Sequence, residues 1–272
     1  MSLFGIITRT VLGLAPAPAR ATAPQHFVAS AALVAAPAAP STAAEVVDRI
    51  QQFYAGIQQV TAKFRQEVTN ATFGSTKPSD GMVWIMKPGK MRWDYLANKK
   101  DVVEVKKSFI SNGMYLYVVE HDNKQVMKKN LSKDLMPVAV SFLYGKGDLK
   151  AEFSPEIDPS GKYGGKGDIV LKLTPKQPSA QYKNLYLVVS PGDFHVSQSV
   201  IVDSSNNVNH FRFFEPDFTT PIKSSYFEFD ERSVKNYRMI DGDAAKEGGS
   251  PAGLPGVKIA PAPTPPARSI KP

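Results

Sequence analysis

The side chains that could carry out chemistry are few, and their spacing matches no common catalytic pattern. The chain has histidines at positions 26, 121, 195 and 210 and no cysteine. The histidine spacing is not that of a metal site, although a two-histidine site formed by His195 and His210 on neighbouring strands stays open. The lack of cysteine excludes disulfides, thiolate catalysis and cysteine-ligated zinc. No metal or cofactor is indicated.

Other catalytic arrangements also lack their sequence signals. There is no Gly-x-Ser-x-Gly turn, and the glycine-rich stretch 161–167 lacks the strand and helix that flank a phosphate-binding loop. Acidic pairs such as Asp230-Glu231 lie near turns. Two carboxylates can meet in space without being neighbours in sequence, so acid–base catalysis stays open as an alternative. We expect that the protein is not an enzyme.

The charge of the chain is concentrated at its two ends. The net charge is +8, from 33 basic and 25 acidic residues among 272. Five of the basic residues lie in 1–40 and 249–272, which contain no acidic residue, so 28 basic residues face 25 acidic ones in between. The short basic runs of this middle part contain acids, whereas nucleic-acid binding needs a basic face with stacking aromatics. We therefore expect no nucleic-acid partner.

What stands out is apolar and aromatic content on short strands. The run Val83 to Met86 is apolar at every position, and alternation places Met91, Trp93 and Tyr95 on one strand face. Such residues can form an ordinary packed core or can line an apolar binding cavity. Composition alone leaves both interpretations open.

The elements that carry these residues can be predicted from periodicity and turn signals. Thr42-Ala43-Ala44-Glu45 is a capping box, and apolar residues at helical spacing behind it predict a helix over about 42–58. From Val60 the period changes to two, which predicts a strand. Further strands are expected at about 81–86, 91–96, 102–110, 114–120 and 125–129, with Pro88-Gly89 and Asn112-Gly113 at turns.

The meander is interrupted at Ser132, where a second helix is expected up to Gly145. Strands are expected again at about 149–154, 168–174, 182–190, 195–203, 207–215 and 225–230. Because helices and strands do not alternate, a parallel α/β fold is disfavoured. We predict a mainly β fold: an unclosed, strongly curved antiparallel β-barrel of about 11 strands, with two helices on its concave side. The space between the sheet and the helices is either fully packed or a cavity.

The two ends of the chain differ in composition from the middle. Residues 1–40 have two basic residues and a short apolar run that ends in small residues, which is typical of a secretory leader. An Ala/Pro-rich disordered extension is the alternative. The Pro-rich segment 246–272 has almost no core-forming residues and is expected to be a disordered tail. A single domain is expected over 41–245, without a lipidation cysteine or a membrane helix.

The ordered series of motifs in this domain resembles the LolA family of periplasmic lipoprotein carriers. The segment 81–95 is similar to the family's glycine-led strand, basic residue plus proline, short turn and aromatic-rich strand. Phe64-Arg65-Gln66 resembles the family's Phe-x-Gln on the first strand. Residues 111–117 resemble its hairpin leading into a strand of aromatics. The likeness extends over about 42–243 and is strongest up to residue 145.

The resemblance implies a cavity that shields acyl chains between the sheet and the lid helices. The expected lipid-binding residues are Val83, Ile85, Trp93, Tyr95, Leu135, Val138 and Phe142. Where the family has an arginine that ties the lid to the sheet, this chain has Lys87, a point donor without the planar fork. An exposed aromatic that the family uses for partner docking corresponds to Met91.

The resemblance also implies function and partners. We expect a periplasmic chaperone that binds the acyl chains of lipoproteins released from the inner membrane and carries them to the outer membrane. The expected partners are acylated lipoproteins, an inner-membrane lipoprotein-release ABC transporter and an outer-membrane lipoprotein acceptor, and the protein is expected to be a monomer. The alternatives are a carrier of another envelope lipid, such as a glycolipid, and a module that senses lipids or mislocalised lipoproteins.

Overall fold

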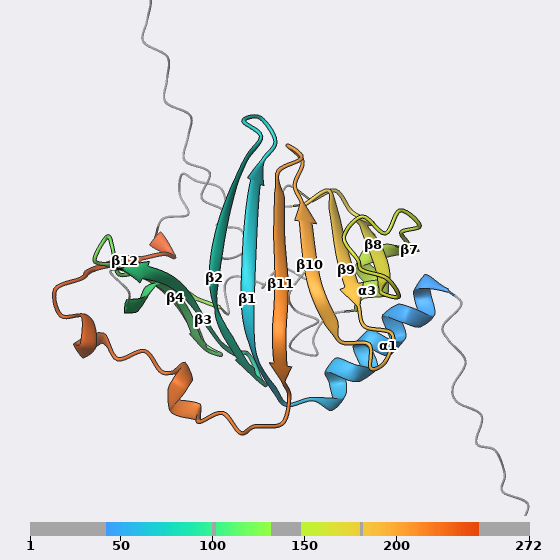
Figure 1. The fold of residues 1–272 in the computed structure, drawn as a ribbon. Helices are drawn as coiled ribbons and strands as arrows, with labels where there is room; N and C mark the ends of the chain where they lie inside the picture. The colour runs from blue at the N-terminus through green and yellow to red at the C-terminus, as the bar shows by residue number, and fades with distance from the viewer. Residues whose placement is uncertain (1–41, 100–101, 132–147, 180–181, 245–272) are drawn as a thin grey trace, which may run out of the picture. The chain divides into compact units, whose positions relative to one another are not determined.

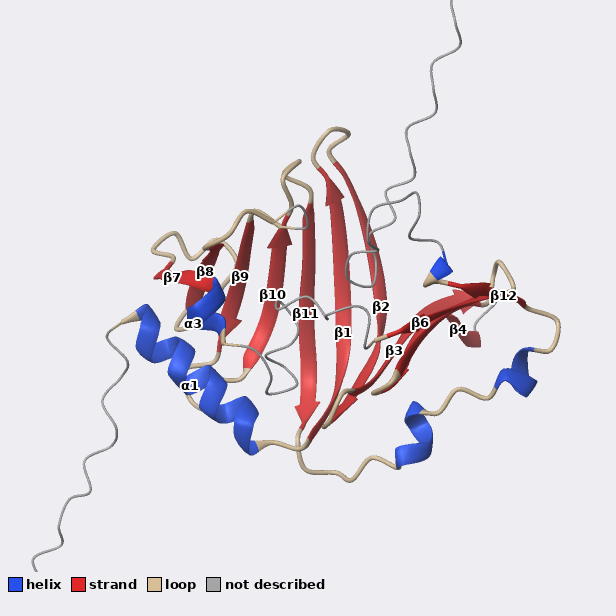
Figure 2. Ribbon diagram, turned by 180° about the vertical axis from the view of Figure 1, so that it is seen from behind, coloured by secondary structure: helices blue, strands red, loops and turns tan. Residues whose placement is uncertain are grey.

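The fold is a single large sheet with one long helix against one face (Figures 1 and 2). The structure, a computed structural model, describes residues 42–99, 102–131, 148–179 and 182–244. These residues form twelve strands, two α-helices and two 3-10 helices. The sequence-based prediction of a mainly β fold with an open, curved sheet is confirmed. The predicted leader, the second helix from Ser132 and the Pro-rich tail lie outside the described residues.

Helix α1 spans Ala43–Gly56, as its capping box predicts. The Thr42 hydroxyl accepts a hydrogen bond from the Glu45 amide, and the Glu45 carboxylate accepts one from the Thr42 amide. Its apolar stripe of Val46, Val47, Ile50 and Tyr54 is buried. The last turn contains no basic residue to interact with the free carbonyl groups at the helix C-terminus, where a cation is favourable.

The strands follow the predicted meander, except that β2 starts at Ser75 and not at Gly81, and the other ends shift by fewer residues. The N-terminal six are β1 Gln59–Asn70, β2 Ser75–Met86, β3 Lys90–Lys99, β4 Val102–Asn112, β5 Tyr115–Glu120 and β6 Gln125–Asn130. The C-terminal six are β7 Phe153–Ile157, β8 Ile169–Pro175, β9 Asn184–Val189, β10 Val196–Val202, β11 Val208–Asp217 and β12 Arg238–Asp241.

The long-range pairing of β1 with β11 joins β1–β6 to β7–β11 in one sheet, and β12 is added at the far edge on β6. The strand order is β12-β6-β5-β4-β3-β2-β1-β11-β10-β9-β8-β7, so β1 lies between its sequence neighbour β2 and the distant β11. In the β1–β11 register Phe64 is opposite Phe213 and Gln66 is opposite Phe211. The two edge strands β12 and β7 do not pair with each other, so the sheet stays open.

Two strand predictions are wrong, and one strand was missed. Residues 149–152 form the short helix α3 (Leu149–Glu152), because the Asp148 carboxylate accepts hydrogen bonds from the amides of Lys150 and Ala151; the strand β7 starts only at Phe153. The predicted strand at 225–230 is instead the 3-10 helix η2 (Ser224–Phe227) followed by an extended stretch. Strand β12 pairs in parallel with β6 and carries no period-two apolar pattern.

Buried side chains form three clusters. In the first, α1 and α3 pack against β7–β10 through residues such as Ile50, Leu149 and Leu187. The second lies on β1–β4 and β11 and is rich in aromatic rings, including Phe64 and Trp93. We call the face of the sheet that carries these two clusters the inner face.

The third cluster lies on the opposite side of β4–β6, which we call the outer face. It contains Ile110, whose neighbour Phe109 belongs to the inner-face cluster, as strand alternation requires. The segment 224–237, which includes η2 and η3 (Glu231–Val234), packs on this face through Phe229, Val234 and Tyr237. Phe229 packs on Tyr117 of β5, and Tyr226 packs on Trp84 of β2.

Gly81 allows two aromatic rings to meet across β2. It is opposite Phe64 on β1 and opposite Tyr95 on β3. The two ring centroids are 5.0 Å apart in an edge-to-face arrangement. A Cβ atom at position 81 would lie 2.5 Å from the Phe64 ring and 2.2 Å from the backbone oxygen of Asp94. The glycine at the head of the 81–95 motif is therefore a packing requirement.

We predict that Gly81→Ala strongly destabilises the fold. The added methyl group would force the Phe64 ring and the β3 backbone apart, and overpacking of this kind costs about 1–3 kcal/mol or more of the free energy of unfolding. Urea unfolding followed by tryptophan fluorescence measures this loss. Gly56→Ala is the control, because nothing lies within 4 Å of a Cβ there, and equal stability of the two variants would contradict the prediction.

Candidate functional site

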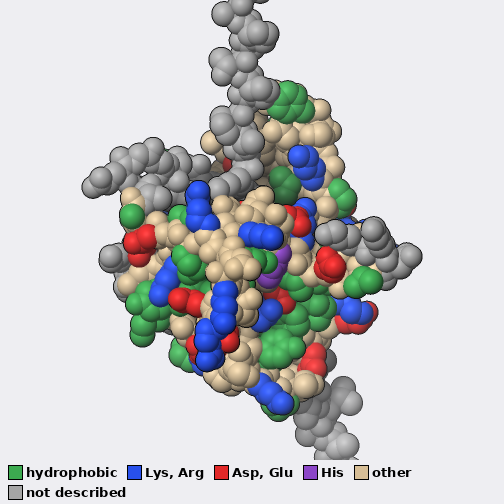
Figure 3. Space-filling model, turned by 90° about the vertical axis from the view of Figure 1, so that its left-hand side faces the viewer, with side chains coloured by type: hydrophobic (Ala, Val, Ile, Leu, Met, Phe, Trp, Pro, Cys, Tyr) green, Lys and Arg blue, Asp and Glu red, His purple; other side chains and the backbone are tan. Residues whose placement is uncertain are grey.

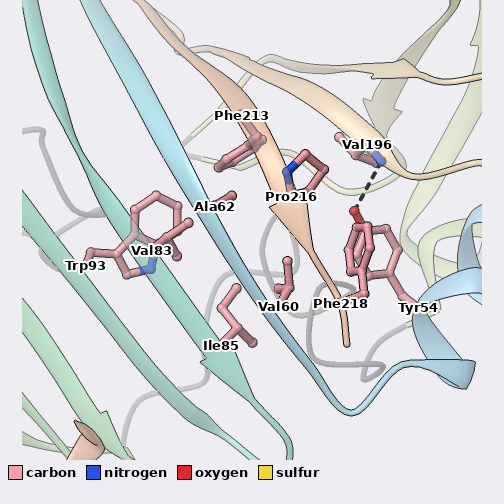
Figure 4. A pocket seen from close by; sticks show the side chains of 10 residues that line it. All are labelled: Tyr54, Val60, Ala62, Val83, Ile85, Trp93, Val196, Phe213, Pro216 and Phe218. Atoms are coloured by element: carbon pink, nitrogen blue, oxygen red, sulfur yellow. Dashed lines mark hydrogen bonds between the residues drawn. The ribbon is translucent and has the colours of Figure 1, made fainter. Parts of the chain in front are cut away.

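An apolar pocket lies between the C-terminal end of α1 and the inner face of the sheet (Figure 4). Its volume is about 30 Å³. The pocket is lined by Tyr54, Val60, Ala62, Val83, Ile85, Trp93, Val196, Phe213, Pro216 and Phe218. These residues come from one helix and five strands, and from the chain just after β11.

Strand alternation positions the wall of this pocket. Val60 and Ala62 on β1 face the same side as Val83 and Ile85 on β2, because Val60 pairs with Ile85 and Ala62 with Val83. Trp93 on β3 is opposite Val83 and extends the wall to a third strand. Paired strands therefore present one continuous apolar surface to the helix.

Aromatic rings close one side of the pocket. The centroid of the Trp93 ring lies 5.1 Å from that of Phe64, 5.5 Å from that of Phe211 and 6.1 Å from that of Phe213. All three partners lie on the inner face, and the contacts are tilted or edge-to-face, the geometry that aromatic pairs favour. Phe64 and Phe211 fill the space beyond the pocket along β1 and β11, so the pocket ends at these rings.

Tyr54 attaches the C-terminal part of α1 to strand β10. Its hydroxyl accepts a hydrogen bond of 3.1 Å from the amide of Val196 on β10, drawn as a dashed line in Figure 4. The side chain is buried, and this burial raises the pKa of Tyr54. The ring contributes apolar surface to the pocket while the hydroxyl satisfies a buried backbone group.

Lys87, in the turn after β2, contacts the C-terminal end of α1. Its ammonium group donates hydrogen bonds to the backbone oxygens of Tyr54 and Ala55, the latter at 3.5 Å. Burial lowers the pKa of Lys87. The Lys87 amide also donates to the Gln58 oxygen at 2.9 Å. The turn after β2 thus supplies the cation that the last turn of α1 lacks.

The structure brings together some of the residues predicted from sequence. Val83, Ile85 and Trp93 line the pocket, whereas Tyr95 is buried next to it against Phe64 and Phe109. Three further predicted lipid-binding residues lie outside the described part of the chain: Leu135, Val138 and Phe142.

The prediction that Met91 docks a partner is wrong. Met91 is 6% exposed and belongs to the inner-face cluster with Trp93. It lies two residues before Trp93 on β3, so alternation turns both side chains to the same buried face. A side chain with so little exposed surface cannot serve as a contact for another protein.

Sequence reasoning did not identify the pocket residues that lie outside β2 and β3. Tyr54 is part of the predicted helical stripe, and Val60 and Ala62 are part of a predicted strand, so their burial could be foreseen but not their place at the pocket. Phe213, Pro216 and Phe218 are near β1 only through the β1–β11 pairing, for which no local pattern gives a signal.

The described polar residues form no obvious reactive centre. His195 contacts Asp193, with 2.6 Å between Nδ1 and Oδ1, and His210 contacts Gln198, with 2.7 Å between Nε2 and Oε1. Burial lowers the pKa of His210 to about 4. Among the residues that the structure describes, no group of three or more acidic or histidine side chains could hold a metal ion. No described helix is long and apolar enough to cross a membrane.

Surface charges are mixed rather than segregated. Figure 3 shows one side of the molecule, on which Lys and Arg side chains lie among Asp and Glu side chains. Elsewhere, Arg65 pairs with Asp80 across β1 and β2 at 2.8 Å, and Arg212 pairs with Glu67 across β11 and β1 at 2.6 Å. Such pairing is typical of solvated strand faces and not of a nucleic-acid-binding surface.

The sequence matches the family described as outer membrane lipoprotein carrier protein LolA over residues 55–230, well over half of the chain. The match extends from the end of α1 to the segment on the outer face, and so includes every pocket residue except Tyr54. The chain belongs to the LolA family.

Curated relatives carry the same family description. The outer-membrane lipoprotein carrier protein of Cupriavidus taiwanensis is 25% identical over 194 residues, which cover 70% of this chain and 86% of the relative. That of Cupriavidus pinatubonensis is 24% identical over 162 residues, which cover 58% of this chain and 72% of the relative. Both are named as lipoprotein carriers, and neither name refers to an enzymatic activity.

Solved structures give weaker similarity. The LolA superfamily protein NE2245 from Nitrosomonas europaea aligns with a TM-score of 0.38 and 10% identity, covering 71% of this chain and all of that one. A conserved protein from Thermus thermophilus aligns with a TM-score of 0.45 and 11% identity, covering 73% of this chain and 98% of that one.

We predict that Tyr54→Phe loosens α1 from the sheet without emptying the pocket. The Val196 amide would stay buried without the hydroxyl acceptor, which costs about 1–3 kcal/mol. Urea unfolding measures the loss, and hydrogen exchange should show faster exchange at α1 amides. Tyr226→Phe, at a residue that is 45% exposed, is the matched control; equal effects of both changes would contradict this assignment.

Proposed function

We propose that the protein is a periplasmic carrier that holds the acyl chains of lipoproteins between α1 and the inner face of the sheet. It receives them from the inner membrane and delivers them to the outer membrane. The observation that carries this proposal is the pocket, whose wall is apolar on every contributing element and whose one hydroxyl, on Tyr54, is already bonded to backbone. Membership of a family of lipoprotein carriers supports the same conclusion.

Energetics explain why such cargo needs a carrier. Each methylene group removed from water contributes about 0.8 kcal/mol, so a lipid anchor with several acyl chains does not leave a membrane for water unaided. An apolar wall between a helix and a sheet provides the necessary cover. Because contacts with such a wall are non-directional, one site can accept chains of different length.

The pocket as described is too small for an acyl chain. Its volume of about 30 Å³ has room for roughly two water molecules. For cargo to bind, the wall has to separate. α1 is the part that can move, since it is joined to the sheet through one segment at its C-terminal end and packs through side chains elsewhere.

Lys87 is the proposed latch for this movement. From the turn after β2 it donates hydrogen bonds to the carbonyl oxygens of Tyr54 and Ala55 near the end of α1, and these bonds exist only while the helix lies against the sheet. Hydrogen bonds to a charged group contribute roughly 1.5–3 kcal/mol, which biases an open–closed equilibrium by one to two orders of magnitude. The closed form favours release, because closing excludes the cargo.

The rest of the chain fits this pathway. Residues 1–40 act as a leader for export, 41–245 form the carrier domain, and 246–272 form a tail. The carrier acts as a monomer, without enzymatic activity, and exchanges cargo with a lipoprotein-release ABC transporter in the inner membrane and an acceptor at the outer membrane.

We predict that the protein purified from cell envelopes without detergent carries acylated peptides. The carrier should be isolated from cells, and its bound lipids identified by mass spectrometry. Lipoproteins with intact acyl chains are the expected cargo. Glycolipids in place of acylated peptides would support the alternative carrier function on this fold, and the absence of any bound lipid would contradict both.

We predict that Lys87→Leu accepts cargo but transfers it poorly, because the closed form loses its latch. Transfer of a lipoprotein from loaded carrier to acceptor membranes should fall roughly ten-fold or more, in line with the lost hydrogen bonds. Lys87→Arg is the matched control and should retain transfer, since it keeps the charge and the donors. If the Leu variant transfers cargo as well as the parent protein, Lys87 is not a latch.

A further inference from the structure

One buried polar atom on the inner face lacks a partner. Asn209 is 5% exposed, and in the part of the chain that the structure describes its Nδ2 is the one buried side-chain nitrogen or oxygen without a hydrogen bond. Its Oδ1 accepts a hydrogen bond of 2.8 Å from Nε2 of Gln66, which is 2% exposed. The Gln66 contact fixes the orientation of the Asn209 amide and leaves its NH₂ group unused.

The position of Asn209 makes this arrangement unusual. It lies on β11, two residues from Phe211 of the aromatic cluster, and is therefore on the same face. Its cross-strand neighbours are Val68 on β1 and Ile201 on β10, and Ile201 belongs to the cluster under α1. A polar amide thus lies where the two apolar clusters of the inner face meet.

An unused donor in such surroundings lowers the stability of the fold. A buried N–H group without a partner costs about 1–3 kcal/mol, and ordinary packing would favour leucine at this position. A water molecule would need two to four polar partners to be held there, whereas most neighbours of Asn209 on this face are apolar. The group that fits the site is an acceptor oxygen within an apolar molecule.

We propose that Asn209, oriented by Gln66, donates a hydrogen bond to a carbonyl oxygen, ester or amide, at the head of an acyl chain of the cargo. This inference rests on the proposed carrier function and adds to it a polar contact that sets the position of the chain. Asn209 is four residues from the pocket residue Phe213 along β11, about 13 Å at the rise of a strand. Between these two positions lie the rings of Phe64 and Phe211, so an acyl chain whose carbonyl binds Asn209 reaches the pocket under α1 only when these rings move aside.

Binding of two matched probes tests the contact. The first is a synthetic lipopeptide with two ester-linked palmitoyl chains, and the second is its dialkyl ether analogue, which has the same chains without the carbonyl oxygens. Affinities are measured by displacement of a fluorescent apolar dye from the full-length protein. We expect the parent protein to bind the ester about five- to ten-fold more tightly than the ether, the size of one hydrogen bond. A third probe, with one amide-linked chain in addition to the ether chains, tells an amide acceptor from an ester acceptor.

Substitutions test whether the side-chain amides of Asn209 and Gln66 cause the preference for the ester probe. Asn209→Leu should remove the ester preference while leaving ether binding within about two-fold. The double variant Gln66→Leu/Asn209→Leu removes both polar groups together, so it should fold even if the single variant does not. Asn123→Leu, in the exposed turn between β5 and β6, is the control and should keep the preference.

The outcomes separate this inference from the proposed function. Equal binding of all three probes by the parent protein, or an unchanged preference in the double variant, overturns the role of Asn209 and leaves the carrier function intact. Failure of the parent protein to bind any probe contradicts the carrier function itself. A carbonyl preference that is lost only on substitution of Gln66 and Asn209 supports the inference.

Discussion

The pairing of β1 with β11 is the contact on which the rest of the structure depends. It joins residues 59–70 to 208–217 and so makes one sheet from two groups of strands. Without it the inner face would be two separate apolar surfaces, each too narrow to enclose a pocket. It also brings Phe213 to the wall formed by β1–β3 and Asn209 to Gln66. Ion pairs such as Lys63–Glu215 across the same strands are exposed and contribute little to stability.

The sheet is covered differently on its two faces. On the outer face, the segment 224–237 packs through ring contacts such as Phe229 on Tyr117 and leads into β12, which pairs with the edge strand β6. On the inner face, α1 buries Val46, Val47 and Ile50 and has polar contacts at its C-terminal end, from Lys87 and Tyr54. Of the two covers, α1 is the one that lies over the pocket, and in the proposed function it is the part that moves.

Local signals in the sequence predict the elements well and the site in part. The capping box at Thr42 and the alternation from Val60 to Gln66 predict α1 and β1 correctly, because both patterns arise from contacts within a few residues. The role predicted for Met91 was wrong because strand alternation, which also governs Trp93, turns it inward. Phe213, Asn209 and β12 could not be placed, since their neighbours are more than a hundred residues away in sequence and nothing local selects the partner strand.

The distance along the chain between β1 and β11 has a kinetic consequence. During synthesis β1 can pair with β2 at once, but its other edge stays unpaired until about 140 further residues have emerged. Contacts between such distant segments form slowly, because the loop between them must close before the contacts contribute. For that interval the unpaired backbone edge of β1 is exposed to other chains. Exposed strand edges of this kind lead to aggregation of β-proteins. Production of this protein should therefore be limited by the time to complete one strand pair rather than by its final stability.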